Sequence, residues 1–457
     1  MAASAFDSFY LRDRYGSPEM RAIWDDRATI QRWLDVEAAL ARVQAELGIV
    51  PKAAARAIAR AARVDRIDLR AMRREFDTTW NPVVPLVNAL RARLPRSAAA
   101  WVHWGATSKN VIDTATTLQI KASYDVVLRQ LDAGESRDRD TLMAGRTHGQ
   151  HALPVTFGWK CATWLDELMR HRERLVASRA RVLVGEWGGA VGTLAALGRA
   201  GLRVEQRLMR RLDLGVPRLP VKTAGDRYAE FFLLLAMLSA TLGKIAQNVY
   251  NLQVTDVDEL SEFVEGKIGS SAMPHKLNPV ASGSVVLLGR LLRARAPLAL
   301  DYVHAEWEDD HRQGETSWAF PQEICLLVSA QLAISARLLG SLIVKAENMR
   351  RNLDRAGGVV LSEAVMMALA PKLGRGQAHE LVRQLHRESQ RRGVPFQQAV
   401  RQHPEVRARL SERRIEQALD YRRSLGLAGY FVDRVLADWR QTRGVRARRP
   451  RRSSSRG

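Results

Sequence analysis

The segment ATIQRWLDVEAALARVQAEL, which runs from Ala28 to Leu47, decides the fold class because its apolar side chains recur at three- and four-residue steps. In an α-helix that spacing places them on one face, which then packs against a protein core. The segment therefore predicts an amphipathic helix with one buried side. The apolar positions are Ile30, Trp33, Leu34, Val36, Leu40 and Val43.

The same periodicity continues along most of the chain. Several periodic stretches exceed the usual length of a helix in a globular protein, and the alternation typical of a half-buried strand hardly occurs. Long helices with continuous apolar stripes pack lengthwise, so we expect an all-α fold built around a helix bundle. The long helices are expected at about Val111–Met143, Gly158–Val184, Ala229–Val264, Ser284–Leu300 and Gln322–Val344.

Breaks that contain glycine and proline divide the chain into three consecutive helical regions and a tail. We expect an N-terminal helical domain over residues 1–108, a central long-helix bundle over 109–350 and a C-terminal helical domain over 351–440. Residues 441–457 are basic and contain few apolar side chains, which predicts a disordered tail.

The positive net charge of the chain raises the question of whether it binds nucleic acid. The 457-residue chain carries 71 Lys and Arg against 49 Asp and Glu, a formal net charge of +22. Arginines are spread along the whole length and cluster clearly only at Arg443–Gly457, so a nucleic-acid-binding function would rest on this tail alone. We expect instead that the positive surface attracts small polyanionic substrates and that no nucleic acid is bound.

The chain shows no membrane or export signal by simple criteria. Its first residues lack the layout of a secretory signal, and no uninterrupted apolar run is long enough to cross a bilayer. Cys161 and Cys325 lie far apart, in apolar contexts, without the spacing of a metal site, and we interpret both as core thiols. We therefore expect a soluble, cytoplasmic protein.

Three polar loops interrupt the long helices. His103–Asn110 (HWGATSKN) puts hydroxyl residues just before a helix, where they serve as ordinary N-caps or, with the first N–H groups, as an anion site. Arg146–His151 (RTHGQH) contains His148, an imidazole suited to acid or base catalysis. Gly269–Pro279 (GSSAMPHKLNP) has the composition of a mobile flap, although a plain surface loop would tolerate it too.

Together these loops carry a resemblance. GSSAMPHKLNP resembles the signature loop of the fumarase/aspartase superfamily, which includes adenylosuccinate lyase and 3-carboxy-cis,cis-muconate cycloisomerase. HWGATSKNVIDT and RTHGQHALPVTFG resemble its two other shared regions, in the expected order, and the similarity runs from about Phe6 to Trp439. The resemblance implies a homotetramer with a twenty-helix core, in which three subunits contribute the three regions of each active site.

The resemblance also implies roles for individual residues. Ser270 would be the base that removes a proton next to a carboxylate, and Lys276 would help to hold the resulting dianion. His148 would act as an acid or bind the leaving group. Such an alkoxide base needs nearby positive charge, and the dianion needs fixed donors. The substrate-binding candidates are Thr107, Ser108, Thr147, Gln150, Asn278, Ser271, Met273, His103, Arg14, Tyr15 and Arg312. Neither a cofactor nor a metal is expected.

The chain departs from the adenylosuccinate lyase pattern. Gly283 stands where a glutamate partner of the catalytic histidine is expected, and Asn110 replaces the usual aspartate of the first region. The stretch Thr78–Pro85 lacks a His-Asp pair and is similar to the muconate cycloisomerase branch. His148 itself is typical of fumarate-releasing lyases, whereas Trp307–Trp318 matches neither branch and is expected to shape the substrate pocket.

Three enzymatic readings stay open. The first is a β-elimination that splits an N-substituted succinate into fumarate and an amine or other nitrogen compound. The alternative is lactonisation of 3-carboxy-cis,cis-muconate or a close relative, and the third is adenylosuccinate lyase of the purine pathway. The substrate would be a small dicarboxylate or tricarboxylate. A non-catalytic structural role is disfavoured because the flap serine and lysine are both present.

Overall fold

The computed structural model describes all residues except 1–3, 133–137, 263–269, 271, 274 and 448–457, and in residues 443–447 it describes the backbone alone. The chain divides into two compact units, each assembled from separate segments. The first consists of 1–133, 171–243 and 284–335, and the second of 134–170, 244–283 and 336–457. These units do not follow the three consecutive regions expected above, and the boundary between them falls inside four long helices. These helices are α8 (Phe157–Val182), α10 (Asp226–Asn251), α11 (Val280–Arg295) and α14 (Pro321–Gly340).

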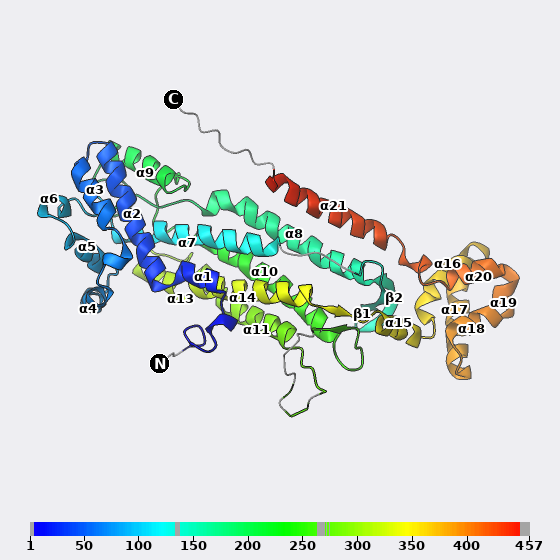
Figure 1. The fold of residues 1–457 in the computed structure, drawn as a ribbon. Helices are drawn as coiled ribbons and strands as arrows, with labels where there is room; N and C mark the ends of the chain where they lie inside the picture. The colour runs from blue at the N-terminus through cyan, green and yellow to red at the C-terminus, as the bar shows by residue number, and fades with distance from the viewer. Residues whose placement is uncertain (1–3, 133–137, 263–269, 271, 274, 448–457) are drawn as a thin grey trace. The chain divides into compact units, whose positions relative to one another are not determined.

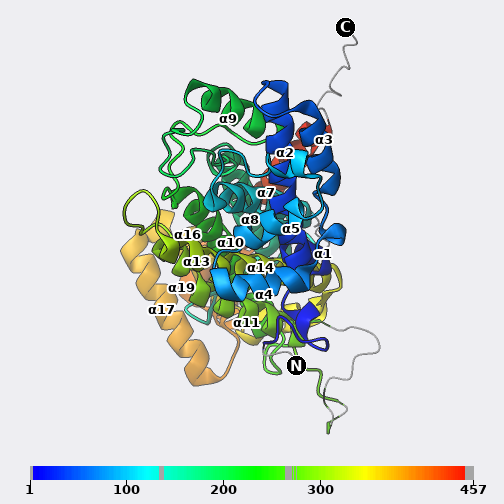
Figure 2. The ribbon, with the colours of Figure 1, turned by 90° about the vertical axis from the view of Figure 1, so that its left-hand side faces the viewer.

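The first unit is all-helical in its described part. The helices that lie entirely within it are α1 (Pro18–Trp24), α2 (Asp26–Glu46), α3 (Lys52–Ala61), α4 (Leu69–Thr79), α5 (Val83–Arg91), α6 (Arg96–Ala99), α7 (Ser108–Leu131), α9 (Arg199–Arg211), α12 (Leu298–Asp301) and α13 (His311–Ala319). Helix α2 packs against α3 and α7 (Figures 1 and 2). Their apolar faces form one core with those of α4 and α5.

Helix α2 shows why its sequence predicted a helix. The Asp25 carboxylate caps the first turn by accepting a hydrogen bond from the N–H group of Ala28 at 2.7 Å. Leu34 and Val43 are completely buried, as the periodicity requires. The observed bounds, Asp26–Glu46, differ from the expected segment by only two residues at the start and one at the end.

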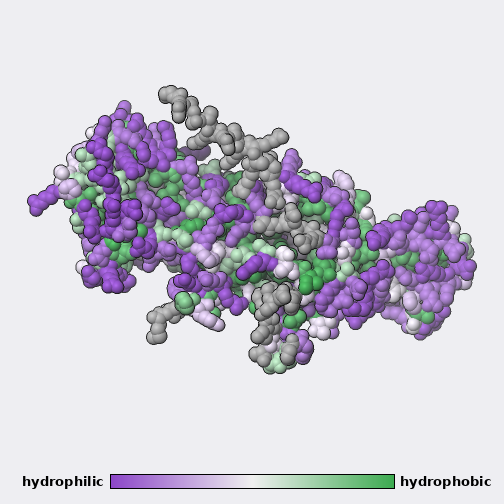
Figure 3. Space-filling view, in the orientation of Figure 1, coloured by the Kyte–Doolittle hydropathy of each residue, from purple (hydrophilic) through white to green (hydrophobic). Residues whose placement is uncertain are grey.

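The second unit adds short strands to its helices. Strands β1 (Leu142–Thr147) and β2 (Gln150–Thr156) form an antiparallel hairpin, and β3 (Leu260–Ser261) pairs with β4 (Ile343–Val344). The helices entirely within this unit are α15 (Ala346–Arg355), α16 (Ser362–Leu373), α17 (Arg375–Arg392), α18 (Phe396–Gln402), α19 (Pro404–Arg409), α20 (Glu412–Ala418) and α21 (Ala428–Ala447). Helices α16 to α20 share one apolar core, and their visible outer surface is largely hydrophilic (Figure 3).

Four expected helices were too long. The helix expected over Ser284–Leu300 ends at Arg295, and the one expected over Gln322–Val344 ends at Gly340, with Ile343 and Val344 in β4. The helix expected over Val111–Met143 ends at Leu131, and Leu142 and Met143 belong to β1. A short buried apolar run fits a strand as well as a helix, so periodicity alone does not separate the two. The helix expected to reach Val264 ends at Asn251. The fold class itself, all-α, is confirmed, because strands are short and few among the described residues.

Among the described residues, two unbroken helical stretches are long and apolar enough to cross a membrane when judged by length and composition alone, contrary to the sequence-based expectation, and a bent pair, Ala346–Arg355 with Val359–Leu373, would add a third if it formed one span. The two unbroken stretches are α10 and His311–Gly340. Within the protein, 67% and 61% of their most apolar windows are buried. Much of their apolar surface is therefore used in packing.

Candidate functional site

The first of the three polar loops leads into α7, in the first unit. The N–H group of Thr107 donates to Asn110 Oδ1 at 3.1 Å, which closes the turn at the start of the helix. The Ser108 hydroxyl donates to Asn81 Oδ1 at 3.1 Å, and the same oxygen accepts from the N–H of Val83 at the start of α5. Thr107 and Ser108 thus lie at the positive end of a 24-residue helix, a position that favours a carboxylate.

His103 lies at the entrance to this turn and is fixed by a buried acid. Its Nδ1 lies 2.5 Å from Oε1 of Glu37, whose other oxygen accepts the backbone N–H of His103 at 3.2 Å. Glu37 is only 1% exposed. The imidazole therefore has its Nδ1 committed to the protein, and only its other ring nitrogen remains for a ligand.

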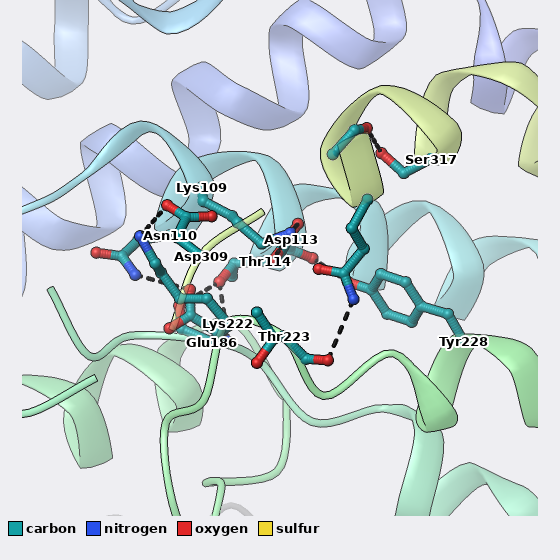
Figure 4. A network of polar contacts seen from close by, with 12 residues as sticks. Lys109, Asn110, Asp113, Thr114, Glu186, Lys222, Thr223, Tyr228, Asp309 and Ser317 are labelled. Atoms are coloured by element: carbon teal, nitrogen blue, oxygen red, sulfur yellow. Dashed lines mark hydrogen bonds and ion pairs between the residues drawn. The ribbon is translucent and has the colours of Figure 1, made fainter. Parts of the chain in front are cut away.

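Behind the start of α7 lies a buried polar network, which Figure 4 shows in close-up. Lys109 pairs with Asp113 at 3.1 Å, one turn further along the helix. Lys222, whose side chain is 3% exposed, pairs with Asp309. Asn110 Nδ2 donates to Glu186 Oε2 at 2.7 Å. The Asn110–Glu186 contact joins the Glu186 loop to the first turn of α7, and the Lys222–Asp309 pair joins two further loops to each other.

Burial shifts the acids of this network. It raises the pKa of Glu186 to about 8, with repulsion from Asp113 adding to the effect and the hydrogen bond from Asn110 opposing it. Burial also raises the pKa of Asp113, and attraction to Lys109 counteracts the rise. With its pKa raised to about 8, Glu186 holds its proton near neutral pH.

The second polar loop forms the tip of a hairpin in the second unit. Thr147 pairs with Gln150, so the turn consists of His148 and Gly149 alone. Both have positive φ angles, 51° and 77°, the combination that defines the tight type I′ turn. A left-handed backbone at a histidine is uncommon and marks a functional candidate. Thr147, His148 and Gln150 are all exposed at this tip.

An ion pair holds the hairpin close to its turn. Arg146 donates to both oxygens of Glu259, at 3.0 and 2.6 Å, and Glu259 is completely buried. The Asn352 side chain donates to the same carboxylate at 3.0 Å. Burial and the positive charge of Arg146 lower the pKa of His151 on β2. Arg146 thus has an anchoring role in the described structure.

The third polar loop is described in part. The N–H groups of Ala272 and Met273 donate to the Ser270 hydroxyl oxygen, at 3.3 and 3.1 Å. Lys276 and Asn278 are exposed, as is Met273. Ser271, another predicted substrate-binding residue, lies outside the described residues. Among the residues that are described, no hydrogen bond or ion pair joins Ser270 or Lys276 to His148.

Three other candidates have protein partners. Arg14 donates to the Ser284 hydroxyl at 3.1 Å, and the Tyr15 ring packs edge-on against Phe6, with ring centroids 5.8 Å apart. Arg312, on α13, forms ion pairs with Asp310 at 2.9 Å and with Glu306 at 3.0 Å, and these raise its pKa. The described positions offer no group of three or more His, Cys, Asp or Glu arranged for a metal ion.

Comparison with known proteins decides the family. A family profile described as "Lyase" matches residues 13–290, and one described as "Adenylosuccinate lyase C-terminus" matches residues 358–435. The chain belongs to the fumarase/aspartase superfamily. It lies in the branch that contains adenylosuccinate lyase and 3-carboxy-cis,cis-muconate cycloisomerase, as its motifs predicted.

Relatives in this superfamily carry different names. The chain is 39% identical to N-acetyl-S-(2-succino)cysteine lyase of Enterococcus italicus, over 97% of this chain and 99% of that protein. It is 37% identical to adenylosuccinate lyase of Methanothermobacter thermautotrophicus, over 93% and 97%. The 3-carboxy-cis,cis-muconate lactonizing enzyme of Pseudomonas putida superposes with a TM-score of 0.87 at 34% identity, over 94% and 98%. The protein is thus an enzyme of the fumarate lyase superfamily with an unsettled substrate.

Two features of this superfamily member escaped sequence reasoning. Asn81 contacts Ser108, although the two lie 27 residues apart. Glu186 reaches Asn110 across 76 residues. The only sequence signal for Glu186 was its position at the start of the glycine-rich turn EWGGAVG, Glu186–Gly192.

Gly283, which replaces the expected glutamate, lies on α11. A side chain added there would have only the Tyr250 ring within 4 Å, at 3.9 Å, so the described surroundings would admit one. The nearby Glu262 already accepts the N–H groups of Ala281 and Ser282, at 2.6 and 3.0 Å. The Glu262 carboxylate therefore caps the first turn of α11.

Proposed function

We propose that this enzyme catalyses a β-elimination on a 2-substituted succinate and releases fumarate together with an amine or a thiol. Ser270 removes a proton from the carbon next to one carboxylate, and the bond between the neighbouring carbon and the nitrogen or sulfur then breaks. His148 supplies the proton that the leaving atom takes up. The carbon skeleton leaves as fumarate, so no oxidant or second substrate is needed.

The observation that carries this proposal is the environment of the Ser270 hydroxyl. Two backbone N–H groups donate to its oxygen, at 3.3 and 3.1 Å. Preorganised N–H donors stabilise negative charge on an oxygen, which a serine needs in order to act as a base. Lys276, six residues further along the same loop, would contribute positive charge to stabilise the dianion, and the neutral Asn278 amide would contribute a hydrogen-bond donor.

The leaving atom distinguishes two versions of this chemistry. The sequence analysis favoured nitrogen. The name of the Enterococcus relative, together with 39% identity over nearly the whole length of both chains, favours sulfur. Arg14 and Tyr15, two of the predicted substrate-binding residues, instead contact Ser284 and Phe6 within the protein. We therefore propose an S-(2-succino) compound as the first substrate to test.

We further propose that Thr107 and Ser108 bind the other carboxylate of the substrate. Their position at the start of α7 supports this assignment, because N–H groups and hydroxyls converge there. The three loops would meet in sites shared by the subunits of a homotetramer, as the resemblance implies. Members of this superfamily act on small dicarboxylates and are typically oligomeric.

The test is a panel assay with the purified full-length protein. The panel contains N-acetyl-S-(2-succino)cysteine, adenylosuccinate, other N-substituted succinates and 3-carboxy-cis,cis-muconate, and fumarate is detected by its ultraviolet absorbance. Fumarate from the sulfur compound, with kcat/KM at least about tenfold above that for any nitrogen compound, is the expected result. A higher kcat/KM for a nitrogen compound would overturn the choice of sulfur. Lactone formation without fumarate from any compound would overturn the elimination itself.

A further inference from the structure

The network behind α7 contains more acids than bases. Its two lysines each have a carboxylate of their own, Lys109 with Asp113 and Lys222 with Asp309. Glu186 is the third carboxylate, and its described side-chain hydrogen bond comes from an amide, Asn110 Nδ2. An ionised Glu186 would therefore be a buried negative charge without a cation of its own, which is costly in a protein interior.

The surroundings of Glu186 fix its position closely. The residue is 3% exposed. Its backbone N–H donates to Thr114 Oγ1 at 3.1 Å, and its backbone carbonyl accepts from the same hydroxyl at 2.8 Å. Its Oε1 atom has no hydrogen-bond partner among the described residues, so a proton placed there removes a charge without breaking a contact.

We propose that Glu186 is a positioning residue that holds the carboxylate-binding turn Thr107–Asn110 by accepting, as a neutral acid, the hydrogen bond of Asn110. The chain of contacts runs from the Thr107 N–H to Asn110 Oδ1 and from Asn110 Nδ2 to Glu186 Oε2. Both ends of the Asn110 amide are thereby fixed. The proposal rests on the proposed function insofar as this turn binds substrate.

The same geometry explains Asn110. The superfamily motif usually has an aspartate here, and an aspartate in this chain would point an acceptor at Glu186 Oε2 over 2.7 Å. Two carboxylates at that distance cannot both ionise. Asparagine has an NH₂ donor where aspartate would have a second acceptor oxygen, so Asn110 can donate to the buried Glu186.

A pH dependence follows from this arrangement. The charged groups that act on Glu186 are Asp113, which favours its protonated form, and Lys109 and Lys222, which favour ionisation. Burial dominates and raises the pKa of Glu186 to about 8. Above that pH, the site gains a negative charge directly behind the turn, so binding of a dicarboxylate weakens.

The experiment compares Glu186→Gln with wild type and with a matched control. Glu205→Gln is the control, because Glu205 on α9 is also a buried acid, 4% exposed, whose pKa burial raises to about 7. The dissociation constant of fumarate is measured by calorimetry from about pH 6 to about pH 10. In wild type and in Glu205→Gln it should rise roughly tenfold per pH unit above about pH 8. In Glu186→Gln that rise should vanish, and an identical rise in all three proteins would overturn the proposal.

A second pair of variants tests the hydrogen bond itself. Asn110→Asp should weaken fumarate binding at least about tenfold at pH 8, because the acid pair then carries charge. Adding Glu186→Gln restores a donor–acceptor pair, with the new amide at position 186 donating to the carboxylate at 110, but leaves the negative charge at 110. Fumarate binding should therefore recover in part, by at least about threefold relative to Asn110→Asp. Failure of the double variant to recover, while remaining folded, would contradict the pairing.

Hydrogen exchange separates this inference from the proposed function. The backbone N–H of Thr107 donates a hydrogen bond to Asn110 Oδ1. The hydrogen-exchange rate of this N–H should therefore increase about tenfold in Asn110→Asp and return to the wild-type rate in the double variant, with or without ligand. If no fumarate binds to any protein but this pattern holds, the proposed function fails and the positioning role stands. If exchange at Thr107 is the same in all variants, the positioning role fails.

Discussion

At the scale of single residues, chemistry concentrates on a few side chains that the backbone holds in specific ways. The Ser270 oxygen accepts two backbone N–H groups, and His148 occupies a left-handed position in a two-residue turn. Glu186 is buried with no ion-pair partner among the residues that the structure describes. Each feature costs the fold some stability or restricts its sequence, and each coincides with a loop that a helix bundle does not require.

The clearest prediction for one residue concerns Ser270. In Ser270→Ala the base is absent, so kcat for fumarate release should fall by roughly 10³-fold or more while the assembly and its helical content stay unchanged. His148→Ala should also lose most of its turnover, because the leaving atom then departs without a proton donor. The measurement is steady-state kinetics beside circular dichroism. Near-normal rates in Ser270→Ala would rule out this serine as the base.

The raised pKa of Glu186 also implies that the free energy of unfolding depends on pH. Its folded pKa lies above the unfolded value, so its contribution to the free energy of unfolding is complete below about pH 4.5 and is lost as the pH rises to about 8. The total loss is on the order of 5 kcal/mol at 1.36 kcal/mol per pKa unit. Glu186→Gln lacks this loss, so its free energy of unfolding in urea, relative to that of wild type, should increase as the pH rises from about 4.5 to about 8. A pH-independent difference would contradict the buried neutral acid.

At the scale of elements, the sequence predicted helices well and their ends poorly. Helix α2 was located to within two residues because one apolar face continues along its full length. The β1–β2 hairpin was missed because Leu142, Met143 and Ala144 form a short buried run without a diagnostic period. The hairpin's ion pair, Arg146 with Glu259, joins residues 113 positions apart, and nothing local signals it.

In the candidate site, too, local features were predicted from the sequence and contacts between distant residues were not. The sequence placed Thr107 and Ser108 at the start of a helix, where the structure has them. Their supports, Asn81 and Glu186, come from distant segments and became visible only in three dimensions. The assignment of Ser270, His148 and the substrate-binding residues stays a prediction, because no ligand contact tests it.

The ion pair of Arg146 with Glu259, close to the turn of the hairpin, yields a prediction for this element. Glu259 is completely buried, so Arg146→Met would leave an uncompensated charge and should lower the free energy of unfolding by about 3–5 kcal/mol. The double variant Arg146→Met/Glu259→Leu removes both charges and should recover much of that loss. Chemical denaturation followed by fluorescence measures both. Equal stability of Arg146→Met and wild type would show that the pair does not hold the hairpin.

For the assembled protein, we expect a homotetramer in which different subunits supply His148 and Ser270. Co-expression of the inactive variants Ser270→Ala and His148→Ala should then restore fumarate release, because some sites in a mixed tetramer receive both intact residues. Random mixing predicts about a quarter of wild-type activity. Each variant expressed alone is the control. Sedimentation that gives a monomer, or mixed tetramers without any recovery, would contradict shared sites.

The most direct test of the central claim is the product balance of the wild-type enzyme with N-acetyl-S-(2-succino)cysteine. Fumarate is measured by ultraviolet absorbance and the free thiol by a colorimetric thiol reagent in the same reaction. We expect both products to appear in equal amounts and at equal rates, as a single elimination requires. Consumption of the compound, or of any other succinate derivative that the enzyme accepts, without release of fumarate would contradict the proposed reaction.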